Sequence, residues 1–140
     1  MPTQAQHLVE AGRTDESLPF SPLLRCLQKD DDYITQKASK IVACLLTHGG
    51  SMKPAELDGY FNWISERLRT VKDAHIETAV QALQTLLLQE RFRVKYFETP
   101  DGMVRLVEVL KLKHNNFQVQ YQVIFCLWLL SFSAPIAASL

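Results

Sequence analysis

The stretch that decides the fold is IETAVQALQTLLL, residues 76–88, because two other stretches match it without gaps. They are ITQKASKIVACLL, residues 34–46, and VQYQVIFCLWLLS, residues 119–131, so the three segments begin 42 and then 43 residues apart. The first, fifth, eighth and twelfth positions of each segment are apolar, which is the spacing of one stripe on an α-helix. The second position is polar in all three (Thr35, Glu77 and Gln120), as an outward face requires.

The shared stripe predicts which side chains are buried. It contains Ile34, Ala38, Ile41 and Leu45 in the first segment, Ile76, Val80, Leu83 and Leu87 in the second, and Val119, Val123, Cys126 and Leu130 in the third. We expect eight of these side chains to lie in the core: Ala38, Ile41, Leu45, Val80, Leu83, Leu87, Val123 and Leu130.

A shorter amphipathic helix precedes each long one. Its signature is a pair of leucine-type residues four positions apart, namely Leu23/Leu27, Ile64/Leu68 and Leu106/Leu110. A helix pair repeated every ~40–47 residues is typical of HEAT and armadillo arrays. The sequence therefore predicts an all-α fold, an α-solenoid of about three armadillo/HEAT-like helix-pair units.

Turn-forming residues fall between the predicted helices. Ser21-Pro22 is typical of a helix start, and Gly49-Gly50 of a left-handed helix end. Pro54 and Gly59 predict a linker before the second unit. The sequence TPDG, residues 99–102, predicts a type I turn that opens the third unit.

Composition limits the classes of partner. At 140 residues, 47% of them apolar, the chain fits one domain, with a polar tail over residues 1–18 and a helical-repeat domain over 19–140. Lysine plus arginine equals aspartate plus glutamate at 15 each, which gives no reason to expect nucleic acid as a partner.

The N-terminus lacks the apolar core of a secretory signal, and the longest apolar run is far short of the ~20 residues of a membrane-spanning helix. We therefore expect a soluble intracellular protein without direct membrane insertion.

No pattern points to chemistry. Phosphate-binding glycine motifs are absent from the sequence, and the four histidines are isolated from one another. His48 lies four residues after Cys44, but two residues alone do not make a metal site. Asp30, Asp31 and Asp32 fit the start of a helix better than a calcium loop. Cys26, Cys44 and Cys126 are predicted to be reduced core thiols. We thus expect no catalytic residues, no metal and no cofactor.

The last long helix is too apolar for a single buried stripe. Three of its aromatic residues, Phe125, Trp128 and Phe132, form the candidate interaction edge. Aromatic clusters of this kind pack in cores or form a groove for a partner. For this edge we expect a docking face for the following repeat of a longer protein, through which the 140-residue chain self-associates.

Three stretches of the sequence are distinctive: GYFNWISERL (residues 59–68), ERFRVKYFETPDG (residues 90–102) and FQVQYQVIFCLWLLSFS (residues 117–133). All three resemble one family, the H subunits of vacuolar-type proton ATPases. The stretch over residues 90–102 is similar to a segment that joins two helix pairs of that family, and the stretch over residues 117–133 is the most specific. The resemblance runs from about Phe20 to the C-terminus.

The resemblance implies a non-enzymatic accessory role. Members of that family are α-solenoids without an active site in the cytosolic sector of the pump. They bridge the stator stalk and the membrane sector, and they help couple ATP hydrolysis to proton transport. The resemblance also implies a peripheral location on the cytosolic face of vacuolar and endosomal membranes. Two alternatives remain open at this point: an unrelated armadillo/HEAT adaptor that binds a peptide, and a small all-α enzyme.

Overall fold

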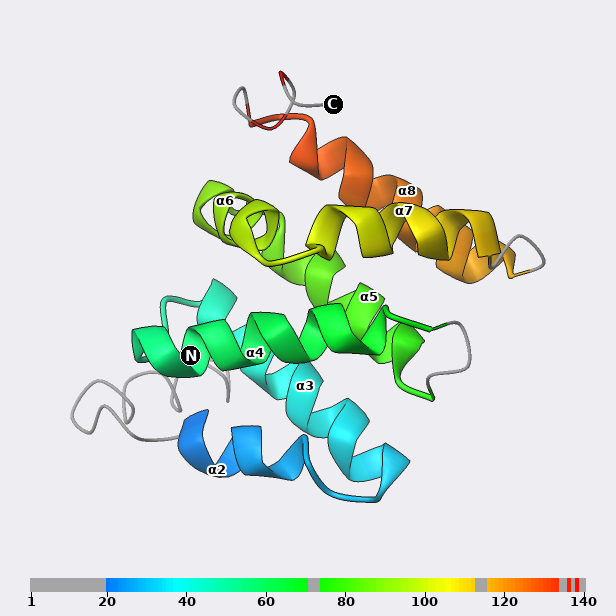
Figure 1. Cartoon of the computed structure of the whole chain (residues 1–140). Helices are drawn as coiled ribbons and strands as arrows, with labels where there is room; N and C mark the ends of the chain where they lie inside the picture. Colours follow the sequence, from blue (N-terminus) through cyan, green and yellow to red (C-terminus); the bar gives the residue numbers. More distant parts are fainter. Residues whose placement is uncertain (1–19, 71–73, 113–115, 134–135, 137, 139–140) are drawn as a thin grey trace, which may run out of the picture. The chain divides into compact units, whose positions relative to one another are not determined.

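The computed structural model describes residues 20–70, 74–112, 116–133, 136 and 138. These residues form seven helices and, within the ranges given, no strand: α2 (Phe20–Cys26), α3 (Asp32–Thr47), α4 (Pro54–Arg67), α5 (Ile76–Leu86), α6 (Glu90–Glu98), α7 (Gly102–Leu112) and α8 (Phe117–Leu130) (Figure 1). The predicted all-α helical-repeat fold class is confirmed. The predicted tail, residues 1–18, lies outside the described residues. The chain divides into two compact units, with the boundary after Tyr60 inside α4.

In the first unit, α2 packs against α3, and both ends of α3 are capped. At its start the Asp31 carboxylate accepts a hydrogen bond from the Ile34 amide at 3.0 Å, as the acidic run predicted. At its end Gly49 has φ 92°, and the amides of Gly49 and Gly50 donate to the carbonyls of Leu46 and Leu45. These two hydrogen bonds form a Schellman motif, so the predicted helix end at the glycines is confirmed.

The register of α3 is shifted by one residue from the prediction. Ile34 and Ile41 are 41% and 39% exposed, so the predicted burial of Ile41 is wrong. Thr35, predicted to face outward, is fully buried. The buried face of α3 consists of Thr35, Ala38, Ser39, Val42, Ala43, Leu45 and Leu46. The other seven predicted core side chains, Ala38, Leu45, Val80, Leu83, Leu87, Val123 and Leu130, are buried.

Hydrogen bonds explain why polar residues occupy the buried stripe of α3. The Thr35 hydroxyl donates to the carbonyl oxygen of Lys29 at 3.4 Å. The Tyr60 hydroxyl donates to the Ser39 carbonyl at 3.2 Å, and the two hydroxyls of Tyr60 and Ser39 lie 3.1 Å apart. A buried hydroxyl group that has a hydrogen-bond partner costs little free energy compared with the same group in water. The sequence pattern followed apolar residues and therefore selected the neighbouring stripe.

Two further boundaries differ from the sequence prediction. α4 begins at Pro54, so Pro54 and Gly59 lie within a helix and not in a linker. Pro54 occupies a first helical position, where its missing N–H has no partner to lose, and a side chain at Gly59 would meet nothing within 4 Å. α2 begins at Phe20, so Ser21 lies inside the first turn and is not the cap.

The segment between the second and third long helices contains a helix of its own. α6 occupies Glu90–Glu98, within the segment that was expected to be a connection. The turn that follows it has the expected hydrogen bond, from the Gly102 amide to the Thr99 carbonyl at 3.1 Å. However, Asp101 has φ 60°, and a positive φ at the third residue belongs to a type II turn and not to type I.

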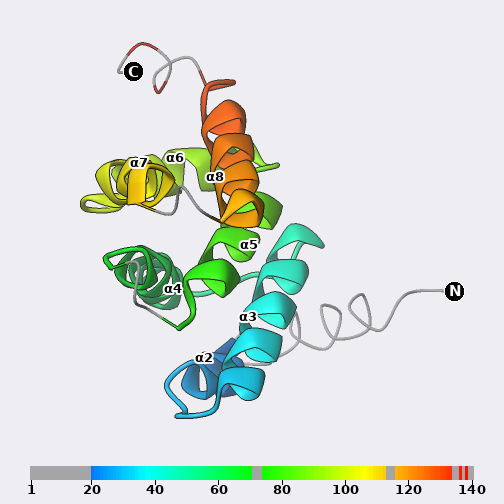
Figure 2. The same ribbon diagram turned by 90° about the vertical axis from the view of Figure 1, so that its right-hand side faces the viewer.

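In the second unit, α8 packs on α5 and on α7, and α6 packs on α7. Hydrogen bonds connect α5 and α8 near their starts and again near their ends, so the two helices run in the same direction. Near their starts Asn116 donates to the Glu77 carboxylate at 3.3 Å. Near their ends the Arg93 guanidinium donates to the Leu87 carbonyl at 3.0 Å and to the Ser133 hydroxyl at 2.9 Å. Figure 2 shows α7 on one side of α8, and none of the described helices of this unit covers the side of α8 that faces the viewer.

Candidate functional site: the outer face of α8

α8 is held by its N-cap and by one buried face. The Asn116 side-chain oxygen accepts a hydrogen bond from the Val119 amide at 3.2 Å, which fixes the first turn. The buried face consists of Val119, Gln122, Val123, Cys126, Leu129 and Leu130. The same positions of α5 are Ile76, Ala79, Val80, Leu83, Leu86 and Leu87, all buried. The two helices thus use one register of the repeat, and it is the register that the sequence predicted for them.

A second row of apolar residues runs along the opposite side of α8. These five side chains, which we call the outer stripe, are Phe117 (79% exposed), Tyr121 (65%), Ile124 (54%), Trp128 (55%) and Phe132 (56%). Phe132 lies two residues beyond the end of α8. At 3.6 residues per turn the other four fall within an arc of roughly 60° over about 17 Å of the helix. Isolated exposed apolar residues are ordinary, whereas a continuous exposed row of them marks an interaction surface.

The three predicted edge residues contact one another. The ring centroids of Phe125 and Trp128 are 5.6 Å apart, and those of Trp128 and Phe132 are 4.7 Å apart with an edge-on angle of 67°. Trp128 and Phe132 belong to the outer stripe, while Phe125 is half-buried beside it. Edge-to-face pairs of this kind are worth ~0.5–1.5 kcal/mol, so they hold the Trp128 ring in a defined position. Phe117, Tyr121 and Ile124 were not part of the predicted edge.

Comparison within the repeat shows that the fold does not require this stripe. Val119 of α8 corresponds to Ile76 of α5. In α3 the equivalent residue is Thr35, because the buried face of α3 begins there. In this alignment the stripe positions of α5 are Ala74, Thr78, Gln81, Thr85 and Gln89, and those of α3 are Tyr33, Lys37, Lys40, Cys44 and His48. Equivalent helices therefore present mostly small, polar or basic residues where α8 presents large apolar ones. This alignment is the signal that could have identified the whole stripe from sequence.

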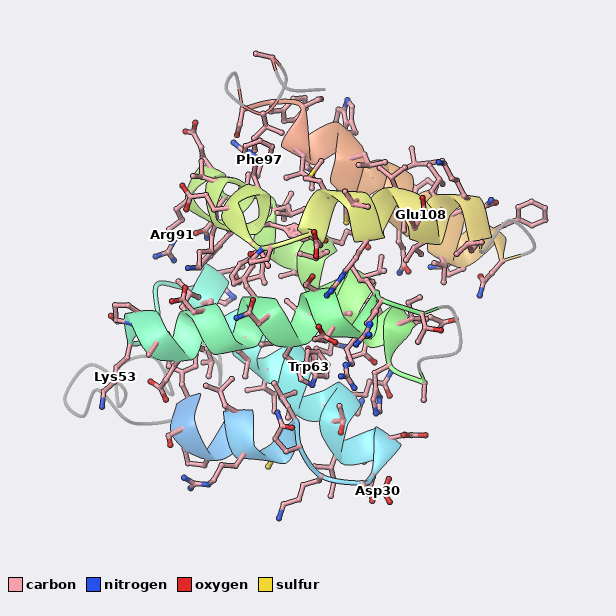
Figure 3. The ribbon with its side chains drawn as sticks, in the orientation of Figure 1. Asp30, Lys53, Trp63, Arg91, Phe97 and Glu108 are labelled. Carbon is pink, nitrogen blue, oxygen red and sulfur yellow. The ribbon has the colours of Figure 1, made fainter. Side chains whose placement is uncertain are left out.

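The outer stripe lies in an uncharged part of the chain. No Asp, Glu, Lys, Arg or His occurs from residue 115 to residue 140. The helices next to α8 are different, because charged side chains extend from their surfaces, Arg91 on α6 and Glu108 on α7 among them (Figure 3). α8 itself therefore offers a partner apolar contact area and no charged side chain.

Two titratable groups in the core beside α8 are stabilised in their neutral forms. Burial raises the pKa of the Cys126 thiol to about 12. Burial also raises the pKa of Tyr96, with a further contribution from Cys126 and an opposing one from Arg105. The Tyr96 hydroxyl donates to the Gly102 carbonyl at 2.6 Å. Neither group is available as a nucleophile or base near neutral pH.

The other residues considered from sequence are not brought together. Cys26, Cys44 and Cys126 are free thiols, but only Cys126 is fully buried. His48 and His75 lie at helix ends, while His7 and His114 lie outside the described residues. Across the described ranges, no group of three or more His, Cys, Asp or Glu could hold a metal. None of the described helices is long and apolar enough to span a bilayer.

Comparisons with known proteins agree with the resemblance. The family model that describes the H subunit of V-ATPases matches residues 2–140. The V-type proton ATPase H subunit of Dictyostelium discoideum is 34% identical over 130 residues, and that of Drosophila melanogaster is 30% identical over 131. A probable V-type proton ATPase H subunit of Caenorhabditis elegans, the one numbered 2, is 35% identical over 120 residues. The matches cover 89%, 93% and 84% of this chain but only 28%, 27% and 25% of the relatives. The chain belongs to the V-ATPase H-subunit family.

Proposed function

We propose that the chain is a non-catalytic regulatory and structural subunit of the cytosolic sector of the vacuolar proton-transporting ATPase. It bridges the stator stalk and the membrane sector and supports the coupling of ATP hydrolysis to proton transport. It is held at the cytosolic face of vacuolar and endosomal membranes through the pump. The observation that carries this proposal is the family match over residues 2–140. That match does not favour an unrelated armadillo/HEAT adaptor.

The helical-repeat fold supports a scaffold role, because such folds present extended surfaces built from successive helices. Within the described residues, the outer stripe of α8 is the largest departure from the pattern of the repeat. It offers apolar contact area and no charged group. Surfaces of this composition bind other proteins.

The proposal is tested by adding the chain to pump-containing membranes from which the native H subunit has been removed. We expect it to co-sediment with the other pump subunits and to increase ATP-driven acidification of the vesicles. An unrelated helical-repeat protein of the same size is the control. Equal sedimentation of the two proteins would contradict the proposal.

The non-catalytic part is tested separately. The purified chain, without other subunits, should release phosphate from ATP no faster than a heat-treated sample. Turnover above that control would overturn the scaffold function.

A further inference from the structure

The spacing of the outer stripe is close to symmetric about its centre. The residues are Phe117, Tyr121, Ile124, Trp128 and Phe132. When two copies of α8 lie antiparallel about a two-fold axis near Ile124, Phe117 faces Phe132 of the other copy. In the same arrangement Tyr121 faces Trp128, and the two Ile124 side chains meet at the axis. Every ring thus meets a ring, which is the self-complementarity that a two-fold interface requires.

The absence of charge at these positions allows two copies of α8 to pair, whereas the charges at the equivalent positions of α3 would oppose such a pairing. No charged residue occurs from residue 115 onward, so the residues of the two stripes do not themselves repel one another by charge. The equivalent positions of α3 include Lys37 and Lys40, both exposed, which would repel the same residues of a second copy. Those of α5 are small or polar and would bury little apolar surface.

The area of the stripe is close to the lower limit for a stable interface. Five side chains that are each more than half exposed cover roughly 600 Å² on each copy, since an aromatic side chain buries 150–250 Å². A stable interface usually buries ~800 Å² per partner. The contact lies just below that size, so we expect a weak, reversible association, and the tests below assume a dissociation constant of ~10 µM.

We propose that the outer stripe of α8 is a self-association surface, and that its occupant is the outer stripe of a second copy of this chain. The copies pair antiparallel, with Ile124 at the two-fold axis. The proposal does not rest on the proposed function, because it concerns the purified chain alone.

The first test measures sedimentation velocity over a concentration series. The wild-type chain should change from monomer to dimer as the concentration rises through ~10 µM. A variant that carries the α5 residues, Tyr121→Thr, Ile124→Gln, Trp128→Thr and Phe132→Gln, should remain a monomer while keeping the helical circular dichroism of the wild type. Val104→Thr is the matched control, because Val104 is 64% exposed on α7 and lies outside the stripe. That variant should dimerise like the wild type.

The second test determines the orientation. Tyr121→Glu and Trp128→Lys should each weaken dimerisation by ~10-fold or more, because each removes a large ring from the contact and buries an unpaired charge there. Mixing the two variants should restore the dimer, since only the antiparallel pairing places Glu at 121 opposite Lys at 128. Failure of the mixture to associate would overturn the antiparallel arrangement.

A wild-type chain that stays monomeric throughout the series, or a stripe variant that still dimerises, would overturn the self-association. If the monomeric wild type bound the pump and the stripe variant did not, the occupant would be a pump subunit. Self-association would then be wrong, while the proposed function would stand.

Discussion

α5 and α8 occupy equivalent places in the repeat, lie side by side and bury the same six positions. Their outer faces are nevertheless opposite in character. α5 presents Thr78, Gln81 and Thr85 where α8 presents Tyr121, Ile124 and Trp128. Because the buried faces are alike, the demands of the fold cannot explain this difference. The comparison therefore separates the residues that hold the repeat together from those available to bind a partner.

The largest loss of stability should come from a change on the buried face, which is alike in α5 and α8. Leu83→Ala removes a fully buried side chain from α5, so unfolding should become easier by ~2–5 kcal/mol through lost burial and a residual cavity. Leu88→Ala, at a residue that is 61% exposed just beyond α5, is the control and should change stability by less than ~0.5 kcal/mol. Urea denaturation measures both. A change below ~1 kcal/mol for Leu83→Ala would place the register of α5 in error.

The next effect concerns one position where the buried faces of the two helices differ, Leu83 in α5 and Cys126 in α8. The Cys126 thiol is fully buried with a pKa raised to about 12, whereas Cys26 and Cys44 are half-buried. At pH 8 an alkylating reagent should modify Cys126 at least ~100-fold more slowly than the other two thiols. Mass spectrometry of the labelled peptides measures the rates. Equal rates at all three cysteines would show that α8 is not packed as described.

The same thiol gives a dependence of stability on pH. Its pKa is higher in the folded chain than in the unfolded chain, so its contribution is complete below the unfolded pKa and is lost as the pH rises toward 12. Stability should therefore fall above about pH 9. Cys126→Val, which places at this position an aliphatic residue without a titratable group, should reduce the fall. Denaturation midpoints at several alkaline pH values measure it, and a flat wild-type profile would contradict the prediction.

A smaller effect concerns the first turn of α8. Asn116 caps α8 through its side chain, whereas His75 at the start of α5 makes no such bond. Asn116→Ala should cost about 1 kcal/mol in thermal or urea unfolding. Asn116→Ser keeps a capping oxygen but loses the bond to Glu77, so it should recover most of that stability. If both variants lost the same amount, the contact with Glu77 and not the cap would be responsible.

The sequence predicted the parts of the fold that rest on apolar spacing alone. In α5 and α8 the buried positions are nearly all apolar, and the predicted stripe was correct. In α3 two buried positions are Thr35 and Ser39, whose hydrogen-bond partners, Lys29 and Tyr60, are not identifiable from spacing. Only the folded chain brings Tyr60 to Ser39, 21 residues away. α6 was missed as a helix for a related reason, since only Phe92 and Tyr96 are buried in it.

The candidate site was predicted in part. The excess of apolar residues in α8 identified Trp128 and Phe132, but Phe125 is half-buried. Phe117 and Tyr121 were missed because they precede the densest apolar run and are separated by polar residues. They become visible when α8 is compared with α5 at equivalent positions. A surface that departs from its own repeat is a sharper signal than apolar content alone.

α8 stabilises the fold with one face and leaves the other available to a partner. This division is tested by urea denaturation of the variant Tyr121→Thr, Ile124→Gln, Trp128→Thr and Phe132→Gln at ~1 µM, where the proposed dimer is dissociated. We expect the free energy of unfolding to fall by no more than ~3 kcal/mol, because the two aromatic contacts of Trp128 are worth ~0.5–1.5 kcal/mol each. A larger loss would show that the outer stripe belongs to the core and that α8 has no free face.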